Sequence, residues 1–454
     1  MSVRLQSAVG GASRRDFLKR SAAVAAAAQL ALGRTVHAAG SDELKIALIG
    51  CGGRGTGAAA QALNTAGPVK LWAMADAFAD RLELSLASLT GGGKVSQGSA
   101  EGLAAKVDVP PERRFVGLDA YQQAIDSGVD VVVDASPPGV RPAHFEYAVR
   151  QGKHVFTEKP LASDAPGVRK VLAAAKEARR KNLKVGVGLQ RHHQHKYLET
   201  IQRVKDGAIG RVLFLRCYWN TGYPGKSQPE RLPGQTEMEY QLRNWYFFTW
   251  LSGDHICEQH IHNLDVSNWV MDGHPVEANG MGGRQVRTGP DWGQIFDHHF
   301  VEFTYADGTK MFSQCRQIQD CWRSVTEHAH GTEGHCDVSG SSIAKGGETV
   351  WSLRAPRGKK QGLGNPYQIE HDVLFDAIRN DKPHMEAEYG ATSTMTAILG
   401  RMATYSGKVV TWDEAFSSEL SLLPERLAFD APAPVAPGAD GLYPVAVPGV
   451  TKAW

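Results

Sequence analysis

A run of glycines close to residue 50 has the spacing of a loop that binds phosphate groups. The run, GCGGRG, follows an apolar segment and precedes a helical pattern. In such a loop Gly50 permits a tight turn, Gly52 lets the backbone approach a pyrophosphate, and Gly55 lets the following helix pack closely on the strand. The N-terminus of that helix then faces the phosphates. The pattern predicts a dinucleotide site formed by Gly50, Gly52, Gly53, Arg54 and Gly55.

An acidic residue ends the next apolar segment. Asp76 lies 26 residues after Gly50, where a carboxylate would accept hydrogen bonds from the hydroxyls of an adenine ribose. Its charge would also repel a 2′-phosphate, so we expect NAD rather than NADP. The alternative role for Asp76 is that of a turn or helix-cap residue.

The segments that must position these residues alternate between short apolar runs and helical patterns from residue 45 to residue 190. This alternation predicts an α/β domain with a doubly wound parallel sheet, whose β-branched strands are buried on both faces. The expected strands are Lys45–Ile49, Lys70–Ala75, Val129–Asp134, Lys153–Glu158 and Lys184–Gly188. The expected helices are Gly55–Ala66, Ala79–Leu89, Ala143–Gln151 and Pro166–Asn182.

After residue 190 the pattern changes to that of an α+β domain with an open, largely antiparallel sheet. Its expected strands include Val212–Trp219, Asp297–Tyr305 and Met311–Cys315. Its expected helices lie near Ser252–Met271, at Pro366–Arg379 and at Ala391–Ser406.

We expect four regions along the chain. They are a signal peptide at 1–38, an NAD-binding Rossmann domain at 42–190, a substrate-binding and oligomerisation domain at 191–430, and a tail at 431–454 rich in proline and alanine. The composition of the tail favours a linker over an arm that wraps a neighbouring subunit.

Three further motifs occur in order along the first predicted domain. They are SPP at Ser136 with His144, KHVFTEKP ending at Pro160, and VGLQR ending at Arg191. With these motifs the chain resembles the glucose–fructose oxidoreductase/inositol dehydrogenase (Gfo/Idh/MocA) family.

The resemblance extends from about Leu44 to about Asp413 and includes a closing stretch, Ile398 to Lys408, associated with secreted members. It implies a Rossmann domain followed by a sheet domain whose flat face often forms homodimers or homotetramers. It also implies cofactor contacts from Ser136, Pro137, His144, Glu158, Lys159 and Gln190.

Lys159 is the first candidate catalytic residue. Hydride transfer at a carbinol carbon needs a group that moves the hydroxyl proton and one that holds the developing alkoxide. Lys159 lies at the carboxyl end of a predicted parallel strand, where open α/β sheets bind their ligands. Within the resembled family its ammonium would bridge the nicotinamide ribose and the substrate hydroxyl, and Glu158 would orient the ribose or the lysine. Without the resemblance, these two residues would be read as a charged strand end.

A second candidate group lies on the expected helix near Ser252–Met271. Glu258, His262 and Asp265 are spaced i, i+4 and i+7 and are expected to share one face. In the resembled family an acidic residue four positions before a histidine lies against the nicotinamide, which assigns catalysis to Glu258 and His262. His262 would act as general base or acid, and Glu258 would fix its tautomer or bind a substrate hydroxyl. Many family members have aspartate where this chain has Glu258.

Aromatic side chains and forked donors suit the faces and vicinal hydroxyls of a carbohydrate. The expected substrate contacts are Arg191, Trp245, Tyr246, His255, Asp265, Arg284 and His298. A metal site is the alternative, because His255, Glu258 and His262 could meet on one helical face and be joined by His192, His193 and His195. Polar lining of a sugar pocket explains two of these histidines equally, so we predict no metal.

The N-terminus has the pattern of a twin-arginine export signal. The motif SRRDFLK at Ser13 precedes an apolar stretch, Ala22–Leu32, that is too short to be a permanent membrane span, and Val36-His37-Ala38 is a small-residue cleavage site. We therefore expect the twin-arginine machinery to recognise the chain and deliver it to the periplasm or another exported location.

Removal of residues 1–38 takes away six basic groups and one acidic group, so the formal charge falls from +2 to −3. No basic cluster survives outside the signal, and we expect neither a nucleic-acid partner nor a membrane-surface partner. The six cysteines show no CxxC spacing, so no disulfide framework is expected, although a late bridge between Cys315 and Cys321 stays open.

These features favour an NAD-dependent oxidoreductase that acts on a hydroxyl of a sugar, cyclitol or glycoside. An exported enzyme leaves the soluble cofactor pool behind, so its cofactor must be tightly bound and regenerated in place. The first alternative is a redox-neutral glycoside hydrolase or lyase, which oxidises a ring hydroxyl, eliminates the aglycone and restores the alcohol. Its additional acid or base would be His255, His260 or Tyr246. The second alternative is a catalytically silent sugar-binding protein.

Overall fold

The computed structural model describes residues 42–224, 230–353 and 364–454. The predicted export motif, apolar stretch and cleavage site lie outside these residues. Within the described ranges, no helix combines the length and the apolar character that crossing a membrane requires.

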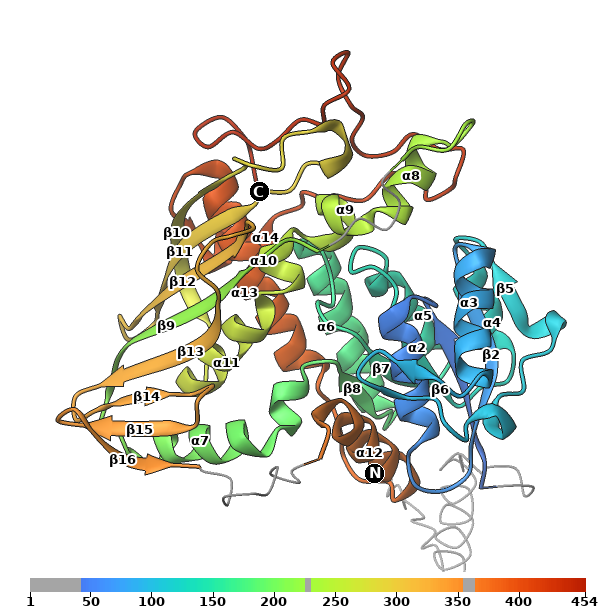
Figure 1. Ribbon diagram of the computed structural model, residues 1–454, viewed down its shortest axis with the longest axis horizontal. Coiled ribbons are helices and arrows are strands. Elements are labelled where there is room, and N and C mark those ends of the chain that lie inside the picture. Colours follow the sequence, from blue (N-terminus) through green and yellow to red (C-terminus); the bar gives the residue numbers. More distant parts are fainter. Residues whose placement is uncertain (1–41, 225–229, 354–363) are drawn as a thin grey trace, which may run out of the picture. The chain divides into compact units, whose positions relative to one another are not determined.

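The described part of the first domain is built on a six-stranded parallel sheet (Figure 1). The strand order is β5-β2-β1-β6-β7-β8, and the chain passes from one half of the sheet to the other between β5 and β6. The strands are β1 (Leu44–Ile49), β2 (Val69–Asp76), β5 (Arg114–Val116), β6 (Val131–Asp134), β7 (His154–Thr157) and β8 (Val185–Val187). The predicted doubly wound parallel sheet is confirmed.

Helices cover both faces of this sheet, as its buried strands require. One buried cluster joins the sheet to α2 (Gly53–Leu63), α3 (Ala79–Thr90) and α12 (Pro366–Arg379). Another joins it to α4 (Ala120–Asp126), α5 (Arg141–Arg150) and α6 (Ala165–Arg180). Helix α12 comes late in the sequence yet packs on α2, so a segment from the expected second domain completes the first one.

The sequence analysis did not predict several short elements. The edge strand β5 and the helix α4 were not expected, nor was the hairpin of β3 (Lys94–Val95) and β4 (Gly98–Ser99). Elements of two to seven residues carry too few positions to show a period, and tertiary packing decides whether they form.

The second domain contains a nine-stranded sheet among the described residues, with the order β16-β15-β14-β13-β9-β12-β11-β10-β17. Its strands are β9 (Val212–Thr221), β10 (Pro275–Gly283), β11 (His298–Tyr305), β12 (Lys310–Gln317), β13 (Ser324–Gly331), β14 (His335–Asp337), β15 (Ser342–Lys345), β16 (Glu348–Ser352) and β17 (Val410–Thr411). Of the pairings that the structure describes, β9 with β12 is parallel and the others are antiparallel. The expected open, largely antiparallel sheet is confirmed.

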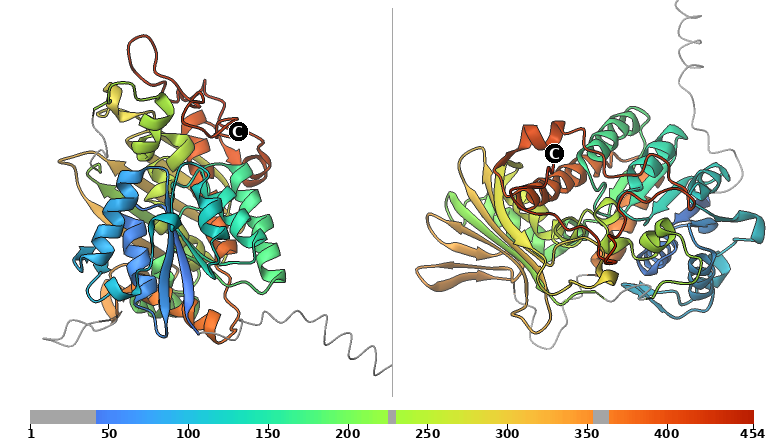
Figure 2. Two further views of the ribbon diagram at one scale, coloured as in Figure 1. Left: turned by 90° about the vertical axis from the view of Figure 1, so that its right-hand side faces the viewer. Right: turned by 90° about the horizontal axis from the view of Figure 1, so that it is seen from above.

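One face of the nine-stranded sheet packs on helices, chiefly α11 (Ile261–Met271) and α13 (Ala387–Ser406). In β11 and β12 buried residues alternate with partly exposed ones, as expected for a sheet with one covered face. Figure 2 shows this curved sheet with its second face uncovered. The remaining described helices are α7 (His195–Lys205), α8 (Glu237–Arg243), α9 (Thr249–Ser252), α10 (His255–Glu258) and α14 (Trp412–Ser417).

The single helix expected near Ser252–Met271 is wrong, because the structure divides this segment into α9, α10 and α11. The break before α10 comes from two consecutive residues with a positive φ, 76° at Gly253 and 75° at Asp254. Asp254 then accepts a hydrogen bond from the backbone N–H of His255. A second break after Glu258 separates α10 from α11, so Glu258 and His262 do not share a helical face.

The C-terminal segment after α14 lacks helix and strand over its described residues, as its composition indicates. It does not leave the body of the protein, however. Ala431 and Tyr443 are 7% and 4% exposed and belong to a buried aromatic cluster with Phe248 and Trp250. The prediction of a linker did not include packing of the tail on its own chain. The six cysteines all fall within the described ranges and are free.

The close approach of β1 and α2 yields a stability prediction. A Cβ at Gly55 would overlap the carbonyl oxygen of Gly50, whereas a Cβ at Gly53 would meet no atom within 4 Å. Gly55→Ala should therefore lower the free energy of unfolding by about 1–3 kcal/mol, in the range of overpacked sites. Gly53→Ala is the matched control and should be neutral. Urea unfolding followed by circular dichroism measures both, and equal stabilities would contradict the assigned role of Gly55.

Candidate active site

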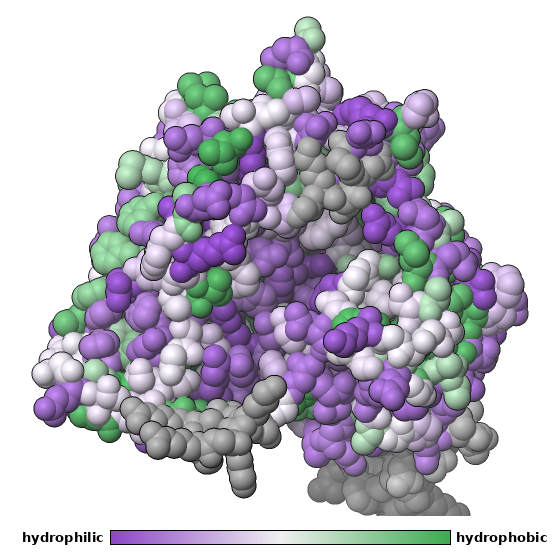
Figure 3. Space-filling view, viewed as in Figure 1, coloured by the Kyte–Doolittle hydropathy of each residue, from purple (hydrophilic) through white to green (hydrophobic). Residues whose placement is uncertain are grey.

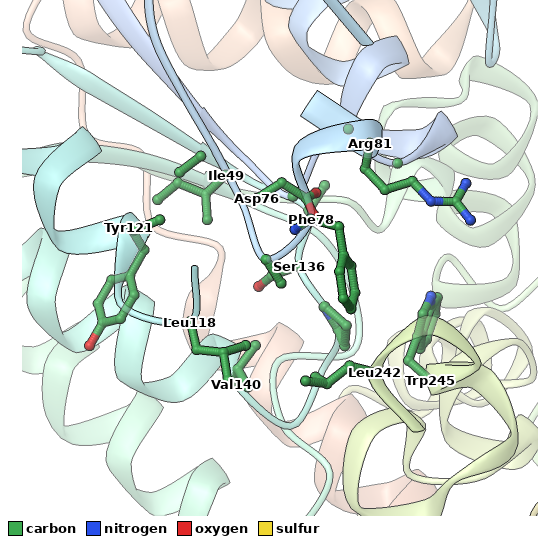
Figure 4. A pocket seen from close by; sticks show the side chains of 18 of the residues that line it. Ile49, Asp76, Phe78, Arg81, Leu118, Tyr121, Ser136, Val140, Leu242 and Trp245 are labelled. Carbon is green, nitrogen blue, oxygen red and sulfur yellow. The ribbon is translucent and has the colours of Figure 1, made fainter. Parts of the chain in front are cut away.

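A cavity of about 270 Å³ lies at the carboxyl end of the parallel sheet (Figure 4). The glycine loop, the end of β2, the loop after β6 and helix α8 contribute to its wall. The predicted cofactor residues that line it are Gly50, Gly52, Gly53, Arg54, Gly55, Asp76, Ser136, Pro137 and His144. Residues separated by more than 90 positions thus converge on one space.

The glycine loop leaves an anion site open at the start of α2. Gly52 occupies the N-cap position, and among the described residues no side chain caps this end and no acidic residue lies in the first turn. A Cβ at Gly52 would meet nothing within 4 Å, so a ligand can approach the free N–H groups of the first turn. Gly50 has a φ of 84°, which favours glycine. These features fit the pyrophosphate of a dinucleotide.

Asp76 both lines the cavity and braces the glycine loop. Its Oδ2 accepts a hydrogen bond from the backbone N–H of Cys51 at 2.6 Å, and its Oδ1 accepts one from that of Phe78 at 2.9 Å. Burial raises the pKa of Asp76, although these two hydrogen bonds oppose the shift. Asp76 thus has the turn role that was its alternative, and it also lies on the cavity wall, where the expected cofactor role requires it.

The loop after β6 is held by polar contacts around His144. Ser136 Oγ donates to Asp134 Oδ1 at 2.6 Å and lies 3.1 Å from His144 Nδ1. The His144 ring stacks on Tyr121 with centroids 4.1 Å apart. Because Ser136, Tyr121 and His144 also line the cavity, these contacts fix its wall.

Glu158 and Gln190 contact protein groups instead of the cavity. Glu158 accepts a hydrogen bond from Arg54 Nε at 2.5 Å and one from the backbone N–H of Lys159 at 3.2 Å. Although burial opposes it, the charges of Arg54 and Lys159 hold the pKa of Glu158 below its usual value. Gln190 Nε2 donates to the hydroxyl of Tyr367 at 3.1 Å. Glu158 thus joins the glycine loop to the end of β7.

Lys159 and Glu258 form a direct link between the two domains. The Nζ of Lys159 donates to the backbone carbonyl of Glu258 at 2.5 Å and to its Oε1 at 3.0 Å. Their side chains are 11% and 10% exposed. The Oε2 of Glu258 is buried and has no hydrogen-bond partner among the described residues, so it can accept a hydrogen bond from a ligand. Figure 3 shows a hollow lined mainly by hydrophilic residues between the two domains.

His262 lies close to this pair on the next helix. Burial, followed by the charges of Lys159 and Arg191, holds the pKa of His262 well below its usual value, so the ring is neutral at ordinary pH. Its Nδ1 has no hydrogen-bond partner among the described residues, and the ring stacks on Trp219 with centroids 5.8 Å apart. Lys159 therefore contacts Glu258 and acts electrostatically on His262, across a helix break.

Two predicted substrate residues, Tyr246 and Trp245, lie close to Glu258 and to the cavity, respectively. Tyr246 receives a hydrogen bond from Gln317 Nε2 at 2.6 Å, and burial together with the charge of Glu258 raises its pKa well above the usual value. Trp245 lines the nucleotide cavity, so the structure places it beside the cofactor site.

Other predicted substrate residues are tied to protein partners. Arg191 forms a buried ion pair with Glu327, and Asp265 lies 2.8 Å from His192 Nε2 and accepts a hydrogen bond from Ser393 at 2.8 Å.

Arg284 and His298, two further predicted substrate residues, contact a loop and the residue before β11. Arg284 donates to the backbone carbonyls of Arg287, Gly289 and Gly293, and burial lowers its pKa to about 10. His298 lies 2.8 Å from Asp297 Oδ1.

The histidines weighed as metal ligands do not converge. His255 Nδ1 lies 2.8 Å from Asp254 Oδ1, and His193 Nε2 lies 2.9 Å from Glu386 Oε1. The grouping of His255 with Glu258 and His262, which the metal alternative requires, is not found among the described residues. Instead, His255 belongs to a buried group with Asp254 and His299, where Asp254 Oδ2 also accepts hydrogen bonds from the Tyr405 hydroxyl at 2.6 Å and the Phe296 backbone at 3.0 Å. These contacts join the break before α10 to β11 and α13.

The sequence analysis missed several residues that shape the site. Trp219 and Gln317 lie on the covered face of the second sheet, and Glu327 neutralises Arg191. Strand alternation could have placed Trp219 and Gln317 on that face, but their partners come from other elements. Phe78 follows Asp76 by two residues and lines the cavity, a position that the glycine motif does not indicate.

Comparison with known proteins identifies the fold and the family. Residues 44–188 match the model described as "Oxidoreductase family, NAD-binding Rossmann fold", and residues 197–337 match the model of the GFO/IDH/MocA C-terminal domain. The two matches together span more than half of the chain. The chain belongs to the Gfo/Idh/MocA family of oxidoreductases. The parallel-sheet domain is thus the family's NAD-binding domain, and the cavity at its carboxyl edge fits that cofactor.

Curated relatives and a solved structure agree with this assignment. An inositol 2-dehydrogenase of Klebsiella pneumoniae (strain 342) is 31% identical over 39% of this chain and 46% of the relative. The match therefore spans about half of that relative's length. An inositol 2-dehydrogenase of Azotobacter vinelandii is 26% identical over 70% of this chain and 84% of the relative. An aldose-aldose oxidoreductase of Caulobacter crescentus shares the fold, with a TM-score of 0.61, 19% identity and coverage of 81% of this chain and 99% of that one.

The position of Lys159 yields a test of catalysis. Lys159→Met removes the ammonium that contacts Glu258, and kcat should fall by about 10²–10⁴-fold, the usual contribution of a positioned proton-transfer group. NADH affinity, measured by fluorescence titration, should change far less than kcat. The matched control is Lys153→Met, because Lys153 donates to the backbone carbonyl of Val129, outside this site. Full turnover in Lys159→Met with the best sugar or cyclitol from a screen would contradict the assignment.

His262 gives a pH prediction. Because its pKa lies well below the usual value, the neutral base persists as the pH falls through the ordinary histidine range of about 6.5. The profile of kcat/KM should therefore show no loss centred near pH 6.5, and its acid limb should lie lower. A loss near that pH that disappears in His262→Gln would show that His262 titrates normally, contrary to this prediction.

Proposed function

We propose that this chain is an NAD-dependent oxidoreductase acting on a hydroxyl carbon of a sugar, cyclitol or glycoside. The observation that carries the proposal is the convergence of Lys159, Glu258 and neutral His262 at the carboxyl edge of the NAD-binding domain. When bound, NAD supplies the hydride acceptor or donor. The names of the relatives, inositol 2-dehydrogenases and an aldose-aldose oxidoreductase, support polyhydroxylated substrates.

The side chains divide the proton chemistry among them. The Lys159 ammonium would hold the reacting oxygen and stabilise the charge that develops on it. The neutral His262 ring would accept the hydroxyl proton during oxidation and return it during reduction. The free Oε2 of Glu258 would accept a hydrogen bond from a neighbouring hydroxyl of the substrate, which favours molecules with vicinal hydroxyls.

The export motif at Ser13 supports a periplasmic or otherwise exported enzyme that carries its cofactor with it. There the reduced cofactor must be reoxidised in place, by a second carbonyl substrate that leaves as an alcohol. This is a ping-pong cycle in which one sugar is oxidised and another compound is reduced.

The redox-neutral glycosidase remains the second candidate. Of the three residues considered for its additional acid or base, His255 contacts Asp254, and His260 lies 2.7 Å from Ser313 Oγ. Burial and the charge of Glu258 raise the pKa of Tyr246 and keep its hydroxyl protonated. Tyr246 is therefore the acid that this scheme would use. A silent sugar-binding protein has less support, because it gives no role to the buried pair of Lys159 and Glu258.

Self-association is also proposed, as a homodimer or homotetramer. The second sheet leaves one face uncovered (Figure 2), and the apolar side chain of Met281 is 74% exposed on that face. Exposed apolar area of this kind favours contact with another copy.

Retention of the cofactor tests the proposed function. The protein is isolated from the periplasmic fraction without added nucleotide and denatured, and the released dinucleotide is identified by mass spectrometry. We expect close to one NAD or NADH per chain, and we expect the variant with Arg14→Lys and Arg15→Lys to stay in the cytoplasm. Paired sugars should then exchange redox state without free NAD. Glycoside cleavage without net oxidation would favour the second candidate, and an empty exported protein would contradict retention.

A further inference from the structure

The C-terminal segment reaches the wall of the NAD cavity. Leu427 is one of the lining residues, and the ring of Phe429 lies 5.6 Å from that of Phe78, which follows the end of β2. Figures 1 and 2 show this chain, coloured dark red, passing close to α8 and α9. A segment more than 350 residues away in sequence from the glycine loop thus closes part of the same space.

Contacts on both sides of Leu427 hold the segment in place. Before it, Arg169 donates to the carbonyl of Ser418 at 2.8 Å, and the backbone N–H of Leu422 donates to Asp164 Oδ2 at 2.8 Å. After it, Gln241 Nε2 donates to the carbonyl of Val435 at 2.6 Å. We call residues 418–443 the C-terminal strap.

The far end of the strap is fixed by an aromatic side chain. Tyr443 is 4% exposed, its ring lies 4.9 Å from that of Phe248, and its hydroxyl donates to Glu237 Oε1 at 2.5 Å. Because both ends of the strap are bound to the rest of the protein, the stretch that contains Leu427 and Phe429 is held against the cavity.

The second domain reinforces this end of the cavity. Leu242, Arg243 and Trp245 line it together with Phe78. Arg243 donates to both carboxylate oxygens of Asp80 at 3.1 Å, and its guanidinium lies 3.9 Å from the centre of the Phe78 ring. Phe78 is therefore held between Arg243 and Phe429.

The position of Asp76 tells which half of the cofactor lies here. An acidic residue at the end of the second strand binds the adenine ribose, and the pyrophosphate lies at the start of α2. Phe78 is two residues beyond Asp76, so the strap borders the adenosine half. The nicotinamide half then extends from the pyrophosphate away from the strap.

We propose that the C-terminal strap is part of the NAD site, and that Leu427 and Phe429 hold the adenosine half and slow its release. Leu427 adds an apolar contact for the adenosine, and Phe429 keeps Phe78 against it. The inference depends on NAD binding by the first domain and not on the identity of the substrate.

A second cavity, of about 570 Å³, lies between strap residues and the residues Thr249, Trp250 and Gln294. On its other side this stretch packs on the buried aromatic cluster through Leu427, Ala428 and Phe429. Displacement of the strap would open the adenosine end without disturbing the parallel sheet.

The experiment measures the dissociation of NADH from the full-length protein, by loss of fluorescence after mixing the complex with excess NAD. Leu427→Ala and Phe429→Ala should each release NADH about tenfold faster, because each loses several apolar carbons from a partly buried contact. The matched control is Leu423→Ala, which changes the same residue type in the same strap but lines the second cavity. Its release rate should equal that of the unmodified protein.

Unfolding of each apo variant in urea separates retention from stability. Faster release from Leu427→Ala and Phe429→Ala, with the unfolding midpoint unchanged, would support the inference. It would be overturned by unchanged release rates, or by equal acceleration in Leu423→Ala with a lowered midpoint. Loss of NAD from the unmodified protein during purification would contradict the proposed retention of the cofactor. It would leave the inference about the strap open to test, because the relative release rates of reloaded variants would still report on the strap.

Discussion

The candidate active site depends on one ion pair, between Lys159 at the end of β7 and Glu258 at the end of α10. The pair joins the NAD-binding domain to the domain that must bind the substrate. Taking two charges out of water is costly unless they compensate one another. The pair therefore joins the two domains at this point, and the lysine charge adds to the effect of burial in lowering the pKa of His262.

The same constraint organises the polar groups around the site. Arg54 contacts Glu158, Arg191 contacts Glu327, and His193 contacts Glu386, and each of these pairs joins elements that are distant in sequence. Buried charges without partners would destabilise the fold, so each pair favours the arrangement of the elements that it joins. Two of the buried polar atoms without a hydrogen-bond partner among the described residues, Glu258 Oε2 and His262 Nδ1, belong to the candidate site and are open to a ligand.

The C-terminal segment adds a third contribution to the same edge of the first domain. A buried cluster of aromatic and aliphatic side chains includes Tyr240 and Trp250, and it packs against Phe78 from the first domain and Leu427 from the strap. Burial of this apolar surface stabilises the closed arrangement around the adenosine end. One nonpolar cluster thus links domain docking to the shape of the cofactor cavity.

The sequence by itself determined the parallel sheet, the open second sheet and the glycine loop, because period, turn chemistry and local motifs are properties of short segments. The proposed roles of Lys159, Glu258 and His262 came from the resemblance to a family. Tertiary structure decided the rest. The helix break at Gly253 and Asp254, the partners of Arg191 and Arg284, the packing of α12 on the first domain and the reach of Leu427 into the cavity all depend on contacts between distant segments. A residue's type states which bonds it can make, whereas only the folded chain determines which partner is within reach.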